Sequence, residues 1–159
     1  MFDKRYEKIL ILVLFLFATG FWLFQHNQVY SWDYSAYVMN AQHWTGERNY
    51  YEHYRAPLAS GIIWMLSIFG WEGSRYLYIL LVSLLFLYSS LKLAESLGFN
   101  KLIFYSISLN PFVIFYGLNI GTELLSLALL ELFVIGLIKG KQRGIFGGLA
   151  SIARYQFVI

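Results

Sequence analysis

The sequence predicts an all-α membrane protein with about five transmembrane helices and short interfacial helices in its first external loop. Of its 159 residues, 58% are hydrophobic and only 13% are charged, whereas ordinary soluble domains carry about 25% charged residues. The apolar residues gather in long runs that end at charged positions, as expected of helices that cross a bilayer with about 20 residues each. The chain has no Cys, so disulfides do not hold the fold together.

The first apolar run, residues 9–24, follows Lys4, Arg5 and Lys8. Basic residues beside an apolar run favour the cytoplasmic side of the membrane. A signal peptide begins in the same way, but no small-x-small cleavage site follows Phe24. We therefore expect a retained first span with a cytoplasmic N-terminus.

Residues 25–75 are predicted to form an external loop with two interfacial helices, over 31–45 and 57–70. In the first, Ser31 is a suitable N-cap and Gly46 a suitable end. Aromatic and apolar residues recur there at helical spacing: Tyr34, Tyr37, Val38, Ala41 and Trp44. Such a face suits the lipid headgroup region. The second helix begins at Pro57, which is tolerated in a first helical turn, and its apolar run is shorter than a span requires.

Four further apolar runs are predicted to span the membrane, at residues 76–97, 102–118, 123–138 and 144–159. If residues 57–70 crossed as well, the basic turn at 139–144 would lie outside, against the positive-inside rule. With five spans, that turn, Lys92 and Lys101 lie on the cytoplasmic side. We therefore predict a single multi-pass domain over residues 1–159, in the plasma membrane of a prokaryote or in the endoplasmic reticulum.

Five acids are predicted to lie on or near the external surface: Asp33, Glu47, Glu52, Glu72 and Glu123. Two of them, Asp33 and Glu123, are singled out because each lies at the start of a helix. Asp33 falls in the first turn of the helix over 31–45, and Glu123 begins the span over 123–138. The simplest interpretation is that both acids stabilise helix N-termini. The functional interpretation is a catalytic pair, in which one carboxylate takes a proton or holds a cation while the other orients the substrate.

Two arginines have alternative predicted partners. Arg154 lies about eleven residues into the last predicted span, about 16 Å from its cytoplasmic edge, and a charge at that depth needs a partner. That partner is either Glu131 on the preceding span or the phosphate of a bound lipid. Arg55 is expected to contact either a lipid phosphate or a carboxylate of its own loop. The basic residues cluster at the ends of apolar runs rather than along a stripe, so nucleic acid is not an expected partner.

Two stretches resemble the GT-C glycosyltransferases, a family of multi-spanning enzymes. They are WDYSAYVMNAQHWTGERNYY with the following HYRAPLASGIIWMLSIFG, and NPFVIFYGLNIGTELLSLALLELFVIGLIKGKQRGIFGGLASIARYQ. Protein O-mannosyltransferases, oligosaccharyltransferase catalytic subunits and lipid A aminoarabinose transferases belong to that family. Its members have a first external loop that opens with an acid, then a second external acidic turn, a basic cytoplasmic turn and a Gly-rich helix with a cation.

The resemblance implies inverting transfer of a sugar from a polyprenyl-phosphate donor to an acceptor on the external face. By the same resemblance, Asp33 is the general base or metal ligand and Glu123 assists it. Arg154, together with Arg55 and His53, is expected to bind the phosphate of the donor. Partners implied are the lipid-linked donor and membrane lipids.

The resemblance leaves the metal and the extent of the enzyme open. Many members have Asp or a paired acidic motif where this chain has Thr122 and Glu123. The two alternatives are therefore a site that holds a divalent cation, Mg²⁺ or Mn²⁺, and a site without a metal. The match covers only the N-terminal part of a usual member, so we expect further helices or a second chain to complete the fold. The rival hypotheses are a non-catalytic membrane subunit, an inactive gene fragment, and a transporter, for which inverted repeats are expected.

Overall fold

The computed structural model describes residues 4–28, 31–119, 121–140 and 143–154, and within these ranges the chain is helical without strands. The all-α prediction is therefore confirmed for this part of the chain. The elements are α1 (Lys4–Gln28), α2 (Trp32–Trp44), α3 (Pro57–Leu66), the 3₁₀ turn η1 (Ser67–Phe69), α4 (Trp71–Leu97), α5 (Lys101–Ser108), α6 (Pro111–Tyr116), α7 (Glu123–Lys139) and α8 (Arg143–Ala153).

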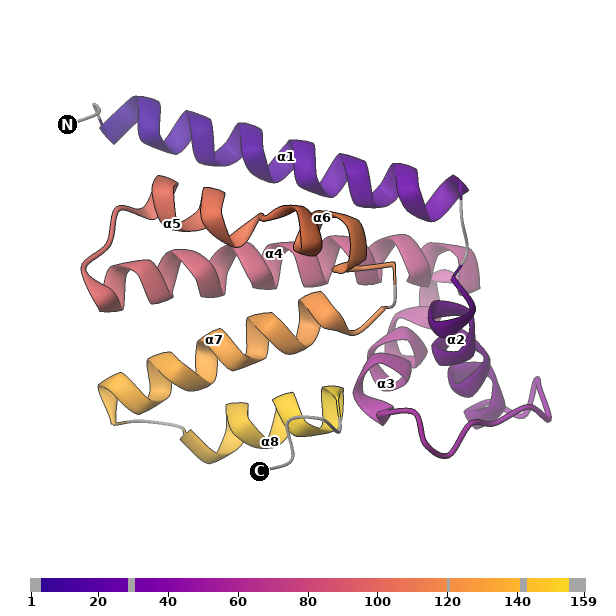
Figure 1. The fold of residues 1–159 in the computed structure, drawn as a ribbon. Coiled ribbons are helices and arrows are strands. Elements are labelled where there is room, and N and C mark those ends of the chain that lie inside the picture. The colour runs from indigo at the N-terminus through magenta and orange to yellow at the C-terminus, as the bar shows by residue number, and fades with distance from the viewer. Residues whose placement is uncertain (1–3, 29–30, 120, 141–142, 155–159) are drawn as a thin grey trace.

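The longer helices run back and forth along one axis, and α2 and α3 lie together at one end of the bundle (Figure 1). We call this the loop end; it comprises α2, α3, the N-terminal ends of α4 and α7, and the C-terminal ends of α1, α6 and α8. The opposite end, with the N-terminus and the α4–α5 and α7–α8 connections, is the turn end. Helix α4 packs against α1, α5 and α7, and α8 packs against α7.

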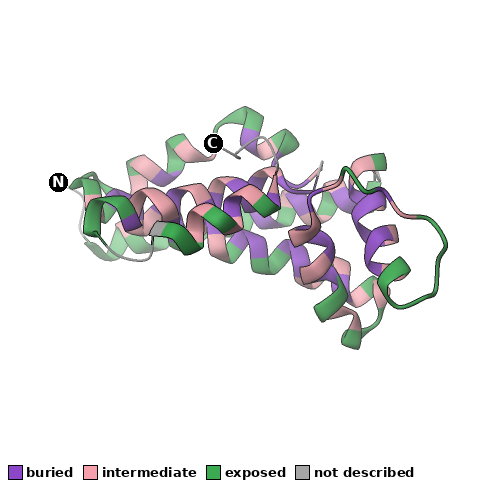
Figure 2. Cartoon of the chain, turned by 90° about the horizontal axis from the view of Figure 1, so that it is seen from below, coloured by how far each residue is buried: buried purple, intermediate pink, exposed green. Residues whose placement is uncertain are grey.

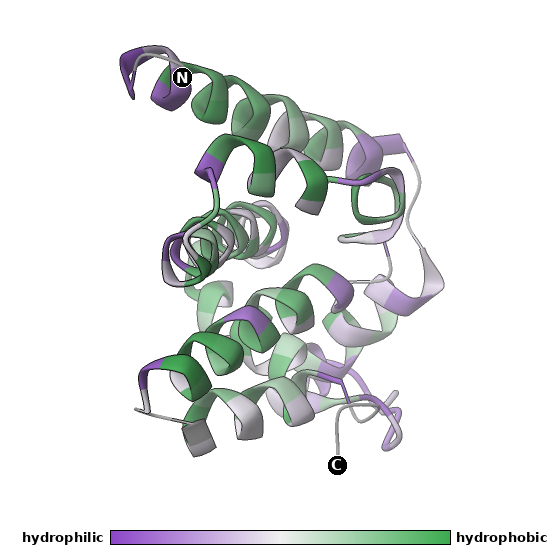
Figure 3. Ribbon diagram, turned by 60° about the vertical axis from the view of Figure 1, so that its left-hand side comes forward, coloured by the Kyte–Doolittle hydropathy of each residue, from purple (hydrophilic) through white to green (hydrophobic). Residues whose placement is uncertain are grey.

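Two helices, α1 and α4, are long and apolar enough to cross a membrane. Apolar residues follow the lengths of the helices, and polar residues gather toward their ends (Figure 3). Much of the outer surface of α1 is also exposed and apolar, with Val13 54% and Phe17 66% exposed. These features are consistent with a membrane protein. The structure does not support five transmembrane helices, because α7 has only 17 residues and α8 only 11.

The prediction of one continuous helix over 102–118 is wrong, because the chain breaks into α5 and α6 at Pro111. Proline disfavours a helical conformation in the residue before it, and Asn110 is extended there (φ −60°, ψ 162°). The Asn110 side chain instead accepts a hydrogen bond from the Val113 amide, at 3.1 Å, and caps α6. The predicted span over 144–159 is helical only to Ala153, and residues 155–159 lie outside the described part of the chain.

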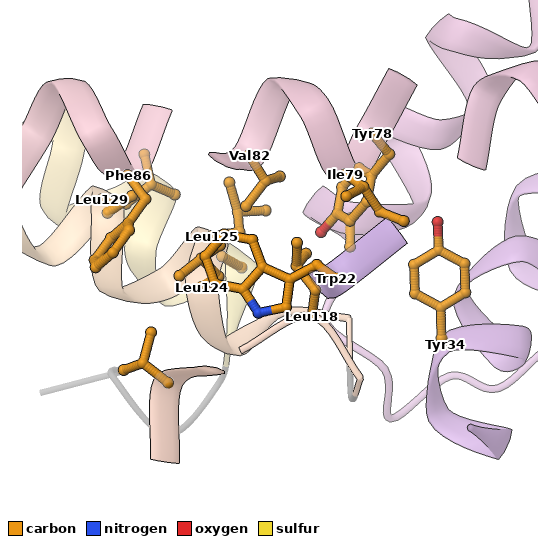
Figure 4. Packing of buried hydrophobic residues seen from close by; sticks show 14 of the residues in the cluster. Trp22, Tyr34, Tyr78, Ile79, Val82, Phe86, Leu118, Leu124, Leu125 and Leu129 are labelled. Carbon is orange, nitrogen blue, oxygen red and sulfur yellow. The ribbon is translucent and has the colours of Figure 1, made fainter. Parts of the chain in front are cut away.

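The core lies between α4 and the helices around it, where the buried residues face the inside of the bundle (Figure 2). Side chains from several helices lie close together there (Figure 4). Tyr78, Val82 and Phe86 of α4 have no exposed surface. Trp22 of α1 is 1% exposed, and its indole N–H donates to the carbonyl of Ile114, at 2.9 Å. A buried indole needs such an acceptor, so this bond fixes α1 against α6.

The helices over 31–45 and 57–70 form as α2 and as α3 with η1, and Ser31 caps α2 by accepting from the Tyr34 amide at 3.1 Å. The expectation that the aromatic face of α2 lies at the headgroups is wrong for two residues. Tyr34 and Tyr37 are only 2% and 6% exposed. The reason is that the α6–α7 turn packs onto this face of α2, which becomes part of the core.

Candidate functional site

The first turn of α2, which carries Asp33, is attached to the turn that leads into α7. The Ser31 hydroxyl donates a short hydrogen bond to the carbonyl of Asn119. The same hydroxyl accepts from the Tyr34 amide, so one side chain both caps α2 and holds the α6–α7 turn. The turn then delivers Glu123, the first residue of α7.

Gly121 allows the α6–α7 turn to lie directly on α2. Its φ is +103°, and a Cβ built there would lie 3.1 Å from Cδ2 of Tyr34 and 3.3 Å from Cδ2 of Tyr37. A side chain at this position would meet both a strained backbone and a crowded contact. The Tyr78 hydroxyl completes the attachment by donating to the Gly121 carbonyl, at 2.5 Å. As a result, Asp33 and Glu123 both lie at the loop end, close enough for their charges to interact.

Asp33 belongs to a charged network centred on Arg55. The Arg55 guanidinium forms an ion pair with Asp33 through Nη1, and its Nε lies 2.6 Å from Oε2 of Glu52. The rings of Tyr37 and Tyr54 lie 5.5 and 5.6 Å from the guanidinium carbon, at cation–π distance. Of the two alternative partners predicted for Arg55, the structure shows the carboxylates.

Glu52 is the buried member of this network, with 4% of its side chain exposed. Burial raises the pKa of Glu52, but hydrogen bonds from Tyr50, Arg55 and Tyr54 outweigh burial and lower it to about 2. The hydrogen bond to Glu52 in turn raises the pKa of Tyr50 to about 12. Glu52 is therefore ionised near neutral pH, and it holds Arg55 in place.

Asp33 is the accessible member of the network. Its side chain is 40% exposed, against 14% for Arg55. A carboxylate with one side on a guanidinium and the other open to solvent can accept a hydrogen bond or a proton from an incoming hydroxyl.

Glu123 pairs with Arg154, and the predicted pair between Arg154 and Glu131 is wrong. Nη1 of Arg154 lies 2.8 Å from Oε1 of Glu123, whose side chain is 10% exposed. Glu131 instead accepts hydrogen bonds from Ser89 and Ser90 of α4. The prediction failed because α8 ends at Ala153, beside the first residue of α7 and about two turns from Glu131.

A pocket of about 300 Å³ opens beside the Glu123–Arg154 pair. Its lining comprises Asn110, Phe112, Val113, Gly117, Glu123, Leu124, Leu127 and Arg154. The ion pair makes part of the wall polar, whereas side chains of α6 and α7 make the rest largely apolar. A small concave site with few polar groups in apolar walls suits a molecule with a charged head and an apolar tail.

Among the described residues, no close contact supports the phosphate-binding role expected of His53 or the binding of a metal ion. His53 is exposed, and its ring lies edge-on to that of Tyr51, with 4.7 Å between centroids. Among the residues described, no group of three or more His, Cys, Asp or Glu side chains could hold a metal ion. Asp33 and Glu123 each have one carboxylate oxygen on a guanidinium, so a dication bound between them would share both carboxylates with the arginines.

Two residues of the site were missed by sequence reasoning. Glu52 was treated as one external acid among several, although its position three residues before Arg55 and two after Tyr50 was a usable signal. Gly121 had no such signal, because its role depends on a packing contact with α2.

No family model, curated protein or solved structure matches this chain.

Proposed function

We propose that this chain is a membrane glycosyltransferase, or the N-terminal module of one. It transfers a sugar from a polyprenyl-phosphate donor to an acceptor on the external face, with inversion at the anomeric carbon. The observation that carries the proposal is the meeting of two acid–arginine pairs, Asp33–Arg55 and Glu123–Arg154, at one end of an apolar bundle.

The donor binds with its phosphate at Arg154 and its hydrocarbon chain along the apolar walls of the adjacent pocket. A guanidinium suits this task because it stays charged and offers several N–H donors to phosphate oxygens. Arg154 is 33% exposed in its pair with Glu123, so part of the group is available to a ligand. Glu123 keeps the guanidinium oriented.

Asp33 is the general base. The acceptor hydroxyl approaches its open side, gives its proton to the carboxylate and attacks the anomeric carbon from the side opposite the phosphate. The bond from that carbon to the phosphate oxygen breaks, and the lipid phosphate leaves with the bonding electrons. Arg55 holds the Asp33 carboxylate beforehand through their ion pair. When the acceptor hydroxyl displaces Arg55 from Asp33, Glu52 still holds the guanidinium in place.

The loop end is the external side in this proposal, and the chain crosses the membrane five times. Helix α1 leads toward the loop end, α4 away, α5 with α6 toward, α7 away and α8 toward (Figure 1). The turn end carries Lys92, Lys101 and Lys139, which agrees with the positive-inside rule. Helix α7 would extend about 25 Å along its axis, so it would cross only a thin or locally thinned bilayer.

The test compares sugar transfer by two variants in membranes, each supplied with radiolabelled polyprenyl-phosphate sugar. Asp33→Asn keeps the shape but removes the base, and we expect transfer to fall about 10²- to 10⁴-fold. Glu72→Gln is the matched control, because Glu72 is an exposed acid of the same end outside the network, and its transfer should be unchanged. Equal transfer by wild type and Asp33→Asn would remove Asp33 from the reaction.

A non-catalytic membrane subunit is the second candidate. It is favoured by the fact that both acids already have arginine partners, as purely structural acids would. It predicts no transfer by correctly folded wild type with any polyprenyl-phosphate sugar, and binding of a second chain that supplies the catalytic groups.

A further inference from the structure

Glu131 is a carboxyl group in the interior of the bundle that the proposed transfer reaction does not use. It lies near the middle of α7 and is 7% exposed. The Ser89 hydroxyl lies 2.5 Å from its Oε2, and the Ser90 hydroxyl lies 3.0 Å from Oε1 and 2.9 Å from Oε2. Both carboxyl oxygens are thus in contact with hydroxyl groups of α4.

A third hydroxyl, from α5, is buried beside this group. Tyr105 has no exposed surface, and its hydroxyl has no hydrogen-bond partner among the residues that the structure describes. Its ring packs at 6.1 Å from that of Phe86, one turn before Ser89 and Ser90, and it is near enough to interact with the charge of Glu131. Buried hydroxyls are normally paired, so the open hydroxyl of Tyr105 marks a polar site with unused hydrogen-bonding capacity.

No basic group accompanies Glu131 among the described side chains. The two serines of α4 donate hydrogen bonds to its carboxyl group. Tyr105 of α5 is a titratable group that interacts electrostatically with it. Arg154, just beyond α8, is paired with Glu123 about two turns away. From α6, no charged group faces it, because α6 has the sequence PFVIFY.

The hydrogen bonds can adapt to a neutral carboxyl group. Ser89 also lies 3.1 Å from the carbonyl of Phe86 and can donate there instead, which leaves its oxygen free to accept from a protonated Glu131. The oxygens already contact one another at hydrogen-bond distance, so a proton fits between them, whereas a metal ion would need them to separate. An unpaired carboxylate in such surroundings is costly, and a bound proton removes that cost.

We propose that Glu131, Ser89 and Ser90 form a proton-binding site inside the bundle, at which the Glu131 carboxyl reversibly takes up one proton. This site is separate from the loop-end acids and does not depend on the proposed transfer reaction.

The test is labelling with a hydrophobic carbodiimide, which reacts with protonated carboxyl groups in apolar surroundings. The purified full chain is reconstituted in phosphatidylcholine vesicles, treated at a series of pH values and mapped by mass spectrometry. We expect modification of Glu131 that is highest at low pH and falls as the pH rises. Replacing sodium with choline at constant pH should leave the modification unchanged.

Two variants keep the test decisive. Glu131→Gln should lose the modification at that position. Ser89→Ala combined with Ser90→Ala retains the carboxyl but removes donors that stabilise its ionised form, so the pH of half-maximal labelling should rise by about one to two units. Labelling that is independent of pH would overturn the proposal, and so would protection by sodium, which would indicate a metal-ion site. Acid-unfolded protein is the control for the reactivity of Glu131. If it is modified there and the folded protein is not modified at any pH, the proposal is overturned.

Discussion

The acids of the loop end and the acid in the bundle interior are compensated in different ways. At the loop end, Asp33 and Glu123 each contact an arginine. In the interior, the polar partners of Glu131 within the described part of the chain are the hydroxyls of two serines. A guanidinium keeps a carboxylate ionised, whereas hydroxyls can serve either the ionised or the neutral form.

This difference separates two kinds of chemistry in one small chain. The partly exposed carboxylate of Asp33 can act on a solvent-borne substrate, and the arginines beside the two acids can hold an anion. A carboxyl group enclosed by α4, α5 and α7 can exchange only a small species with its surroundings.

The largest effect on stability is expected from Glu52→Gln, which removes the negative charge of the buried carboxylate that binds Arg55. The variant removes the buried carboxylate partner of a guanidinium that is only 14% exposed, and the free energy of unfolding should fall by about 3 kcal/mol. The measurement is denaturant-induced unfolding of the purified protein in mixed micelles. Glu72→Gln, at an exposed ion pair of the same end, should change it by less than about 0.5 kcal/mol; similar losses in both variants would contradict the role of Glu52.

Acid should reproduce part of that loss in the wild type. The pKa of Glu52 is lowered from 4.5 to about 2 in the folded protein. A lowered pKa contributes stability above the unfolded value, and this contribution is lost as the pH falls from about 4.5 toward about 2. Unfolding measured across this range should show a decline in wild type that is weaker in Glu52→Gln. Parallel declines would assign the acid sensitivity to other carboxyl groups.

Arg154→Ala should weaken binding of the lipid-phosphate donor. Loss of one charge-assisted contact corresponds to about 1.5–3 kcal/mol, and we expect the KM for the donor to rise about 10- to 100-fold. Arg48→Ala is a suitable control, because Arg48 is an exposed cation of the same end outside both acid–arginine pairs. If both variants raise KM equally, general electrostatic attraction rather than a phosphate site explains the effect.

Gly121→Ala should loosen the attachment between the two halves of the loop end. The positive φ and the contacts with Tyr34 and Tyr37 predict a loss of about 1–2 kcal/mol in unfolding free energy. Gly20→Ala is the matched control in α1, where a Cβ meets nothing within 4 Å, and it should be neutral or slightly stabilising. An unaltered Gly121→Ala protein would show that the turn does not need this close approach.

Local signals in the sequence predicted the loop-end helices well. Ser31 and Pro57 lie at the helix starts that they indicate, because caps and first-turn prolines act within a few residues. The placement of Asp33 and Glu123 at one end also followed from the order of the predicted spans, because successive spans run in opposite directions.

Contacts between distant elements could not be predicted in the same way. Glu131 is one of the two partners predicted for Arg154, on the expectation that the last span runs through the membrane, whereas α8 ends at Ala153 and Arg154 pairs with Glu123. The break at Pro111 was obscured by the apolar residues on both sides of it. The burial of Tyr34 depends on Gly121, which lies far along the sequence, and no local pattern reveals such a contact.

The sidedness of the loop end is the central claim, and thiol labelling tests it most directly. The chain has no Cys, so single cysteines report without background. Glu72→Cys marks the loop end and Lys139→Cys the turn end, both at exposed positions. With a membrane-impermeant maleimide added to intact cells, we predict labelling at position 72, and at position 139 only after permeabilisation. Labelling of position 139 from outside, with position 72 protected, would place both acid–arginine pairs on the cytoplasmic side and contradict the account.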